Sequence, residues 1–303
     1  MSGTARVIPN TDLFTRIGVR DPYFALRTVA AFREGTLEAE VPIQLASEQE
    51  IGPITAGEAA RHLGLLASCA LAEANRDRSL HYYLARTATL VRTAASSTAT
   101  RLEGRASGEL VGSDAGRAHA SLHLRGGGTL FELDVEFSVL SAARFHKLFE
   151  GAKRDLRKAS RPPVLERRHS GELKIMRSNP YGAPLELSNM DLSPGADLIE
   201  ATFGPIPPGA CSGHFPMYPV LPTGIVMSAL SQLCGELLRR RKGDVKYLVR
   251  HAEARADNLA LVGETVRFEA RYVGGSSKNY RFECKARSGS RPVGAVALTL
   301  QLA

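Results

Sequence analysis

The segment from Gly213 to Gly224, GHFPMYPVLPTG, holds the residues of this chain that are best suited to chemistry. Its single histidine, His214, stands among prolines that restrict the backbone, and the segment leads directly into an apolar stretch from Ile225 to Leu238. An imidazole in a rigid loop just before a nearly uncharged helix suits a site that holds a small polarised group, such as a thioester carbonyl, against a base. No Asp or Glu lies between His214 and Glu236, so this stretch offers the histidine no carboxylate partner.

The composition and length of the chain limit the class of protein to which it can belong. The chain has 303 residues, which favours two domains or one double domain, and 44% of them are apolar, as in ordinary globular proteins. The four cysteines are scattered without a CxxC pair, so we expect neither a disulfide framework nor a zinc site. Residues Met1 to Asn10 lack the apolar core of a signal peptide, and no apolar run reaches the ~20 residues of a membrane span. We therefore expect a cytoplasmic protein.

Other kinds of site are poorly supported. The sequence has no GxSxG elbow, no GxGxxG fingerprint and no P-loop, and we expect no cofactor. His119 and His123 share a strand face at best and have no third ligand nearby, so we expect no metal site. Nothing near Cys211 would activate its thiol as a nucleophile beside His214.

The net charge of +8 comes largely from two basic segments. Arg144 to Arg168 carries nine Lys or Arg against three acids, and Arg239 to Lys242 closes the apolar helix. These cations are either solvated faces, partly suited to a helix C-terminus, or a docking surface for an acidic partner. We expect no nucleic-acid partner, because aromatic residues are not interleaved with the basic ones.

The chain reads as two copies of one unit. Tyr83 to Thr89 resembles Tyr247 to Glu253, Leu37 to Ala39 resembles Ile199 to Ala201, and Pro53 to Gly57 lies where Pro219 to Gly224 lies in the second half. The offsets are all about 162 to 167 residues, and this shared order indicates a duplication.

Each copy has the same order of predicted elements: a hairpin, a Pro/Gly loop, a long helix and four strands. The hairpins are expected at Val29 to Pro42 and Leu185 to Phe203, and the helices at Gly57 to Asn75 and Gly224 to Arg241. The strands are expected at 82–93, 98–110, 117–124 and 129–139, and then at 246–256, 265–272, 279–286 and 293–302. This order predicts an α+β fold in which each antiparallel sheet wraps around a helix. The units are 1–141 and 181–303, joined by a basic, partly helical linker at 142–180.

These features resemble the hotdog fold, and the second half resembles the bacterial β-hydroxyacyl-acyl-carrier-protein dehydratases. The resemblance is carried by Gly213-His214-Phe215-Pro216, by Pro219, and by Leu221-Pro222-Thr223-Gly224 before a helix with Gln232. It covers roughly residues 198–232 and implies a double hotdog whose first unit lacks the GHFP motif. A monomeric double hotdog and a homodimer of such units are both compatible with it.

The resemblance also implies roles for individual residues. His214 matches the family's catalytic base, which removes the α-proton of a 3-hydroxyacyl thioester, and the amides around Thr223 and Gly224 match the place that holds the thioester carbonyl. A helix start suits an oxygen that gains negative charge. Phe215 would hold the imidazole in place, and Tyr218 is expected to contact the substrate.

The family's acid is replaced in this chain, because its position is Ser228, and a serine hydroxyl is a poor proton donor at neutral pH. In hotdog pairs the acid comes from the helix of the facing unit, where the position matching Ser228 is Arg61. Glu58, one turn earlier, and His62, beside Arg61, are the candidate acids. Glu58 is equally well explained as a carboxylate that stabilises a helix N-terminus, and Arg61 and His62 as ordinary surface or interface residues.

The resemblance therefore predicts a dehydratase of 3-hydroxyacyl thioesters on an acyl carrier protein, in fatty-acid or polyketide-type biosynthesis, with the basic surface docking the acidic carrier. Because the usual acid is missing, three alternatives stay open. The site could isomerise an enoyl thioester, hydrolyse a thioester, or bind acyl chains without turnover.

Overall fold

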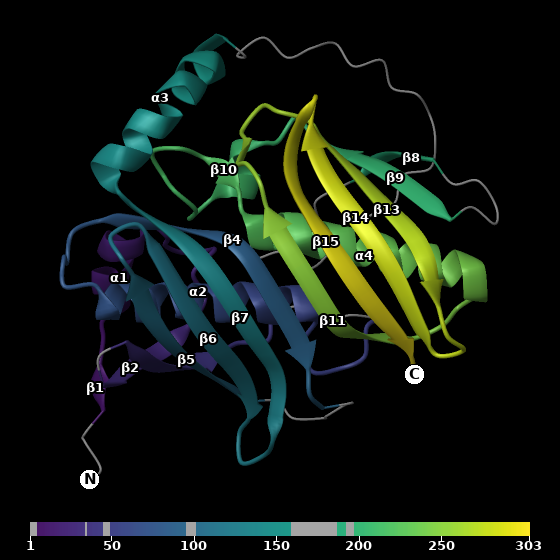
Figure 1. Ribbon diagram of the computed structural model, residues 1–303, viewed down its shortest axis with the longest axis horizontal. Coiled ribbons are helices and arrows are strands. Elements are labelled where there is room, and N and C mark those ends of the chain that lie inside the picture. The colour runs from purple at the N-terminus through teal and green to yellow at the C-terminus, as the bar shows by residue number, and fades with distance from the viewer. Residues whose placement is uncertain (1–4, 34, 45–48, 95–100, 159–186, 192–196) are drawn as a thin grey trace.

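An antiparallel sheet of 13 strands curves around two long helices in the computed structural model, which describes residues 5–33, 35–44, 49–94, 101–158, 187–191 and 197–303 (Figure 1). Its strand order is β1-β2-β3-β5-β6-β7-β4-β11-β15-β14-β13-β9-β8. The first half contributes β1 (Arg6–Val7), β2 (Arg27–Arg33), β3 (Thr36–Val41), β4 (His81–Arg92), β5 (Leu102–Val111), β6 (Ala115–Leu124) and β7 (Thr129–Ser141). The second half contributes β8 (Ser188–Asp191), β9 (Leu198–Phe203), β11 (Tyr247–Ala256), β13 (Val266–Gly275), β14 (Asn279–Ser288) and β15 (Arg291–Leu302). A separate pair joins β10 (Val220–Leu221) to β12 (Ala260–Leu261).

The two long helices, α2 (Ala56–Ala74) and α4 (Thr223–Lys242), lie in the concave side of this sheet (Figure 1). Along β14, buried and exposed residues alternate, as the two-residue period of a half-buried strand requires. A glycine lets the sheet approach α2 closely, because a Cβ on Gly108 would lie 2.9 Å from the backbone nitrogen of Leu71. The core is therefore a helix–sheet interface in each half.

The halves join along one seam of the sheet and along the two helices. Strand β4 pairs with β11 in the antiparallel sense, from His251 opposite Val91 to Arg255 opposite Thr87. The helices run in opposite directions, because Gly57 near the start of α2 lies against Ser228, while Arg61 lies against Gly224 at the start of α4. This antiparallel contact decides which residues of the two units face each other.

The predicted α+β architecture is confirmed, with both long helices, the first hairpin and all eight later strands present at ends shifted by a few residues. The helix predicted in the linker is α3 (Ala142–Lys158), while the rest of the linker and the turn expected in the second hairpin lie outside the described residues. Two short helices were not predicted: α1 (Asn10–Ile17) and the 3-10 helix η1 (Pro208–Cys211). No helix within the described ranges is long and apolar enough to cross a membrane.

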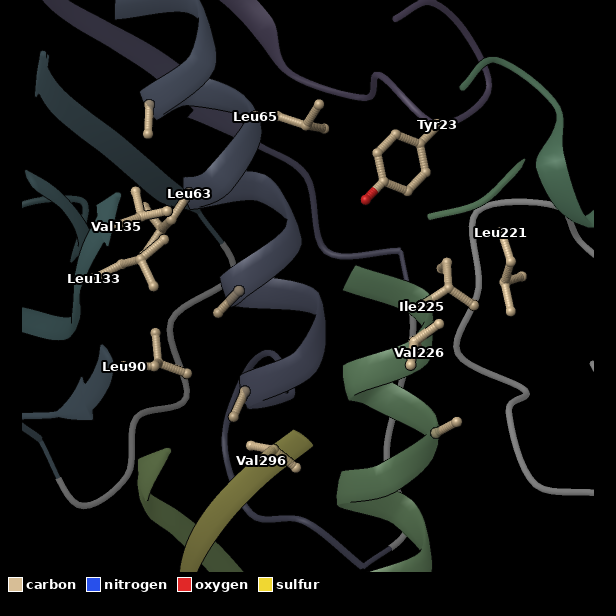
Figure 2. Close-up of a cluster of buried hydrophobic side chains, with 14 of the residues drawn as sticks. Tyr23, Leu63, Leu65, Leu90, Leu133, Val135, Leu221, Ile225, Val226 and Val296 are labelled. Atoms are coloured by element: carbon tan, nitrogen blue, oxygen red, sulfur yellow. The ribbon is translucent and has the colours of Figure 1, made fainter. Parts of the chain in front are cut away.

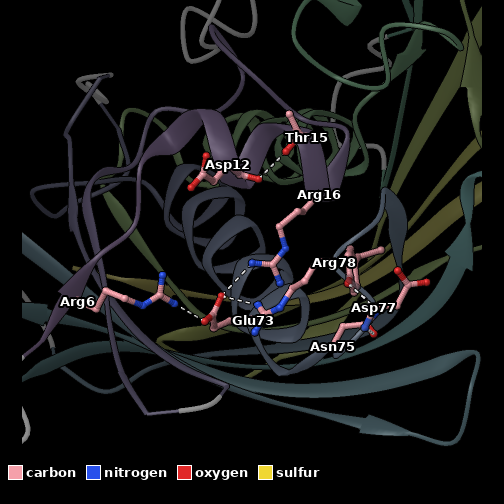
Figure 3. Close-up of polar contacts among 9 residues, drawn as sticks. Arg6, Asp12, Thr15, Arg16, Glu73, Asn75, Asp77 and Arg78 are labelled. Atoms are coloured by element: carbon pink, nitrogen blue, oxygen red, sulfur yellow. Dashed lines mark hydrogen bonds and ion pairs between the residues drawn. The ribbon is translucent and has the colours of Figure 1, made fainter.

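Helix α1 is tied to the far end of α2 by a carboxylate shared among three arginines (Figure 3). Glu73 accepts hydrogen bonds from Arg16 at 2.9 Å and Arg78 at 3.0 Å, and also from Arg6. Burial acts to raise the pKa of Glu73, but the Arg16 hydrogen bond and the charges of the three arginines outweigh it and leave the pKa lowered. The cluster therefore fixes α1, and with it the loop that follows α1.

Candidate active site between the two helices

A cavity of about 410 Å³ lies between α2, α4 and the seam of the sheet, and both halves of the chain line it. Its wall is mostly apolar, and several of its side chains are seen in Figure 2 between the two helices and the strands around them. The lining includes Val19, Tyr23, Arg61, Leu65, Ser68, Leu90, Leu133, Val135, Phe137, Phe149, His214, Phe215, Thr223, Gly224, Met227, Ser231, Val249, Ala252, Ala254, Val296 and Leu298. A pocket of this size and polarity suits an acyl chain with one reactive polar group.

The loop that carries His214 is held against the first unit by backbone contacts. Arg20 donates to the Gly213 carbonyl at 2.8 Å, and Phe215 donates to the Gly18 carbonyl at 3.1 Å. Gly213 has φ 76°, and any Cβ there would clash with the Arg20 and Asp21 carbonyls, so only glycine fits. The histidine of the second unit is thus positioned by the loop that follows α1.

His214 lines the cavity with its ring stacked on Phe215 at a centroid distance of 4.0 Å. Burial lowers the pKa of His214 to about 3, and a hydrogen bond with the Val220 backbone offsets only part of this effect. The imidazole is therefore neutral at physiological pH. Phe215, which was expected to hold the imidazole, has a positive φ of 48°.

Tyr218 does not line the cavity. It packs with Phe145 of α3, at a centroid distance of 5.3 Å and nearly perpendicular. Phe145 also stacks on Tyr82 at 3.8 Å and meets Phe215 edge-on at 5.5 Å. Helix α3 therefore covers the outer side of the His214 loop, and its Phe149 reaches the cavity wall.

The start of α4 opens onto the cavity at Thr223 and Gly224. The residue before the helix is Pro222, which provides no side-chain cap, and the first intrahelical bonds are donated by Ile225 and Val226. The amides of Thr223 and Gly224 precede those bonds and have no partner within the helix. An uncapped helix start that lines a cavity is a place for an oxygen with partial negative charge.

Tyr23 lies opposite this helix start and was not anticipated from the sequence. Its side chain is 5% exposed, and its ring meets that of His214 edge-on at a centroid distance of 5.1 Å. The Tyr23 hydroxyl approaches α4 so closely that a Cβ on Gly224 would lie 2.9 Å from it (Figure 2). No motif marks a lone tyrosine in a loop as part of a distant site, so only the fold reveals it.

The candidate acids predicted on α2 are not among the described lining residues. The helix turns its positions 57, 60, 61, 64, 65 and 68 toward the cavity, whereas Glu58 and His62 lie on the adjacent face. Both are buried, with His62 Nε2 3.5 Å from Glu58 Oε1. Burial lowers the pKa of His62 well below its usual value, and the charge of Arg61 lowers it further. Glu58 accepts a hydrogen bond from the Gln44 amide at 2.7 Å.

Arg61 reaches the cavity, as its equivalence to Ser228 suggests, although its guanidinium points toward the first unit. It donates to the Tyr23 carbonyl at 2.8 Å and lies 3.1 Å from His62 Nε2, and it also donates to Gln44. Ser228 bonds the Gly224 carbonyl of its own helix at 2.8 Å and lies against Gly57, where the helices cross. Among the described lining residues Asp257 alone carries a carboxylate, and that group pairs with Arg255 at 2.9 Å.

The fold of the chain is also that of solved structures with very different sequences. A TesB protein of Mycobacterium avium subspecies paratuberculosis is 11% identical, with a TM-score of 0.56 over 91% of this chain and 95% of that one. A hot dog fold protein of unknown function from Alicyclobacillus acidocaldarius is 9% identical, with a TM-score of 0.53 over 93% and 97%. A 12:0-ACP thioesterase from Umbellularia californica is 8% identical, with a TM-score of 0.52 over 89% and 95%.

The chain is a double hotdog. No protein-family model matches it. At such low identity the comparisons establish the fold, and they confirm the predicted double-hotdog class. They do not single out the dehydratase family, because the similar proteins named as enzymes are thioesterases. The function must therefore be argued from the cavity.

Proposed function

We propose that this double hotdog hydrolyses acyl thioesters in the cavity between α2 and α4. The observation that carries the proposal is that a neutral His214 and the uncapped start of α4 line the same apolar cavity. The cavity would hold the acyl chain, and the Thr223 and Gly224 amides would receive the thioester oxygen. Similar solved structures named as acyl-CoA and acyl-ACP thioesterases support this reading.

The reaction follows from the groups present. His214 takes a proton from a water molecule as the water oxygen attacks the thioester carbon, and the carbonyl oxygen becomes an oxyanion at the α4 start. When the intermediate collapses, the carbon–sulfur bond breaks, the sulfur leaves with the bonding electrons, and the proton held by His214 then passes to the thiolate. A thiol has an ordinary pKa of ~8.5, so it leaves as a thiolate without a strong acid beside it.

Dehydration is the second candidate, favoured by the GHFP loop itself. It asks more of the site, because a departing hydroxide needs a proton from a positioned acid. The two groups predicted for this role, Glu58 and His62, face away from the described cavity. Hydrolysis makes no such demand, and for this reason we favour it over dehydration.

An acyl chain on an acyl carrier protein is the form of substrate that we favour. Helix α3 borders the cavity through Phe149 and exposes Lys147, where an acidic carrier would dock. Arg144 on the same helix is also exposed, but it pairs with Asp114 at 3.3 Å. The arginines at the end of α4 are less available, since Arg239 and Arg240 pair with Glu236 and Arg241 pairs with Asp197. A Lys147→Glu variant should lose kcat/KM for acyl-carrier substrates and keep it for acyl-pantetheine.

Mass spectrometry of the products tests the reaction. The protein is incubated with saturated, 3-hydroxy and enoyl thioesters of pantetheine over a range of chain lengths. We expect free acid from the wild-type protein, and a loss on the order of 10³-fold in His214→Gln. Loss of one water from the 3-hydroxy substrate would establish dehydration instead, and unchanged mass with a shifted double bond would establish isomerisation. Substrates that bind without any change would make the protein an acyl-binding module.

A further inference from the structure

The described cavity contains a second polar group, the Tyr23 hydroxyl, which has no part in the hydrolysis as proposed above. Tyr23 reaches the site from the loop between α1 and β2, and its hydroxyl makes no hydrogen bond within the described part of the chain. Tyr23 as a residue is 5% exposed, and it lines the described cavity rather than the outer surface. A hydroxyl that lines a mostly apolar cavity and has no protein partner is placed to bond a ligand atom.

The position of the hydroxyl indicates which ligand atom that is. It lies beside Gly224, the second residue of α4, where a Cβ would be only 2.9 Å away. The helix amides at this point face the same space and also lack partners within the helix. Two kinds of donor, one from each unit, thus converge on one small volume next to His214.

We propose that the Tyr23 hydroxyl donates a hydrogen bond to the carbonyl oxygen of the bound thioester, opposite the Thr223 and Gly224 amides. Tyr23 is then a catalytic residue contributed by the first unit. This inference rests on the proposed function, since it needs an acyl thioester in the cavity. With Tyr23 the first unit contributes a residue to the reaction, although the acids predicted on α2 do not line the described cavity.

The chemistry of the phenol fits a donor that keeps its proton. Burial raises the pKa of Tyr23 to about 12, although the nearby charge of Arg61 acts to lower it. A phenol of this pKa stays protonated in the resting site and does not readily give its proton to a thiolate, whose conjugate thiol has a pKa of ~8.5. It stabilises charge on oxygen by hydrogen bonding alone, as a preformed oxyanion donor does.

The ring is held firmly enough for this task. Arg61 donates to the Tyr23 carbonyl at 2.8 Å, and its guanidinium carbon lies 5.6 Å from the ring centroid. The loop itself is anchored by α1 and by the backbone contacts to the His214 loop. A donor that is already in place costs little ordering when charge develops, which is the condition for large catalytic effects.

The test removes one oxygen from the protein and one from the ligand. Tyr23→Phe keeps the ring against His214 and deletes the hydroxyl, while Tyr280→Phe makes the same change on β14, away from the described cavity. Two pantetheine probes are titrated by calorimetry: an acyl ketone, in which a methylene replaces the sulfur, and the matching alkyl compound without the carbonyl oxygen. Hydrolysis of an acyl-pantetheine thioester is measured on the same three proteins.

We expect Tyr23→Phe to weaken the ketone about fivefold to tenfold, to leave the alkyl compound unchanged, and to lower kcat on the order of 10²-fold. Tyr280→Phe should match the wild type throughout. Equal losses for both probes would make Tyr23 a packing residue and overturn this inference while the proposed function stands. If neither probe binds the wild type and no thioester is hydrolysed, the proposed function fails and this inference fails with it.

Discussion

The two long helices begin in equivalent places of the two units, yet the first turn of α2 is capped by side chains and the first turn of α4 is not. The start of α2 is closed by its own chain: Thr55 accepts a hydrogen bond from the Glu58 amide at 3.2 Å, and the Glu50 carboxylate accepts one from the Ala56 amide at 2.7 Å. The start of α4 follows Pro222, has no side-chain cap, and meets Tyr23 and His214.

The first unit thus has a carboxylate of its own at the start of its helix, whereas the described part of the second unit has none there. A carboxylate at the start of α2 occupies the position at which a substrate oxyanion would gather, and it would repel such an oxygen. Arg92 holds this carboxylate at 3.4 Å and also donates to the Val249 carbonyl of the other unit, at 3.2 Å. One helix start has become part of the junction between the halves, and the other remains open for a ligand.

The largest effect concerns Glu50, whose pKa burial raises to about 7 although Arg92 and the Ala56 amide act to lower it. Because the folded-state pKa lies above the unfolded value, its contribution to stability is complete at low pH and is lost as the pH rises through 7. Glu50→Gln does not titrate. We expect the free energy of unfolding of Glu50→Gln, minus that of the wild type, to increase by about 3 kcal/mol between pH 4.5 and pH 8. Urea unfolding of both proteins at the two pH values measures this difference in unfolding free energy. A difference that does not change with pH would contradict a raised pKa for Glu50.

The second effect addresses the open helix start. Gly224→Ala places a methyl group against the Tyr23 hydroxyl and the stem of Arg61, in the volume assigned to the thioester oxygen. We expect kcat/KM for thioester hydrolysis to fall on the order of 10²-fold. Thermal unfolding should change little, since alanine favours a helix over glycine. Full activity in Gly224→Ala would show that the oxygen binds elsewhere.

The third effect belongs to the closed helix start. Thr55→Ala removes the cap of α2 and should cost about 1 kcal/mol of unfolding free energy while leaving kcat/KM of the folded protein unchanged. Chemical denaturation and initial rates on the same preparation provide the two readings. A loss of activity larger than the loss of folded protein would mean that the two helix starts are not functionally distinct.

The smallest expected effect is a flat pH profile. Since burial lowers the pKa of His214 to about 3, the imidazole stays neutral down to that pH. We expect kcat/KM to remain constant between pH 8 and pH 5, where a histidine of ordinary pKa ~6.5 would lose activity about tenfold per unit. An inflection near pH 6.5 that disappears in His214→Gln would show that the open site admits more water than its burial indicates.

The fold and half of the site follow from the sequence because they depend on local patterns. Internal similarity reveals the duplication, and hydrophobic spacing reveals the helices and strands. His214, Phe215, Thr223 and Gly224 lie in one contiguous motif. The predictions on α2 depended on which helix face meets the second unit. The antiparallel contact places Gly57 against Ser228, so the cavity face carries Arg61. Glu58 and His62 lie beside each other on the adjacent face, where Glu58 bonds the Gln44 amide.

Tyr23 could not be predicted because nothing local distinguishes it. Its place depends on α1, which the hydrophobic pattern did not reveal, and on the contact between the loop at Gly18 and the loop at His214. That contact joins a segment of the first unit to a segment of the second unit that is far away in the sequence. A side chain positioned in this way carries no sequence signature until the packing of the two units is known.

The seam between β4 and β11 has one further consequence. Both halves of the chain contribute residues to the described cavity, and the two halves are covalently joined. Two separate hotdog chains would have to find each other in solution, and their pairing would follow the law of mass action. Here the second hotdog is always present at a high effective concentration beside the first, so the pairing of the two hotdogs does not depend on how far the protein is diluted.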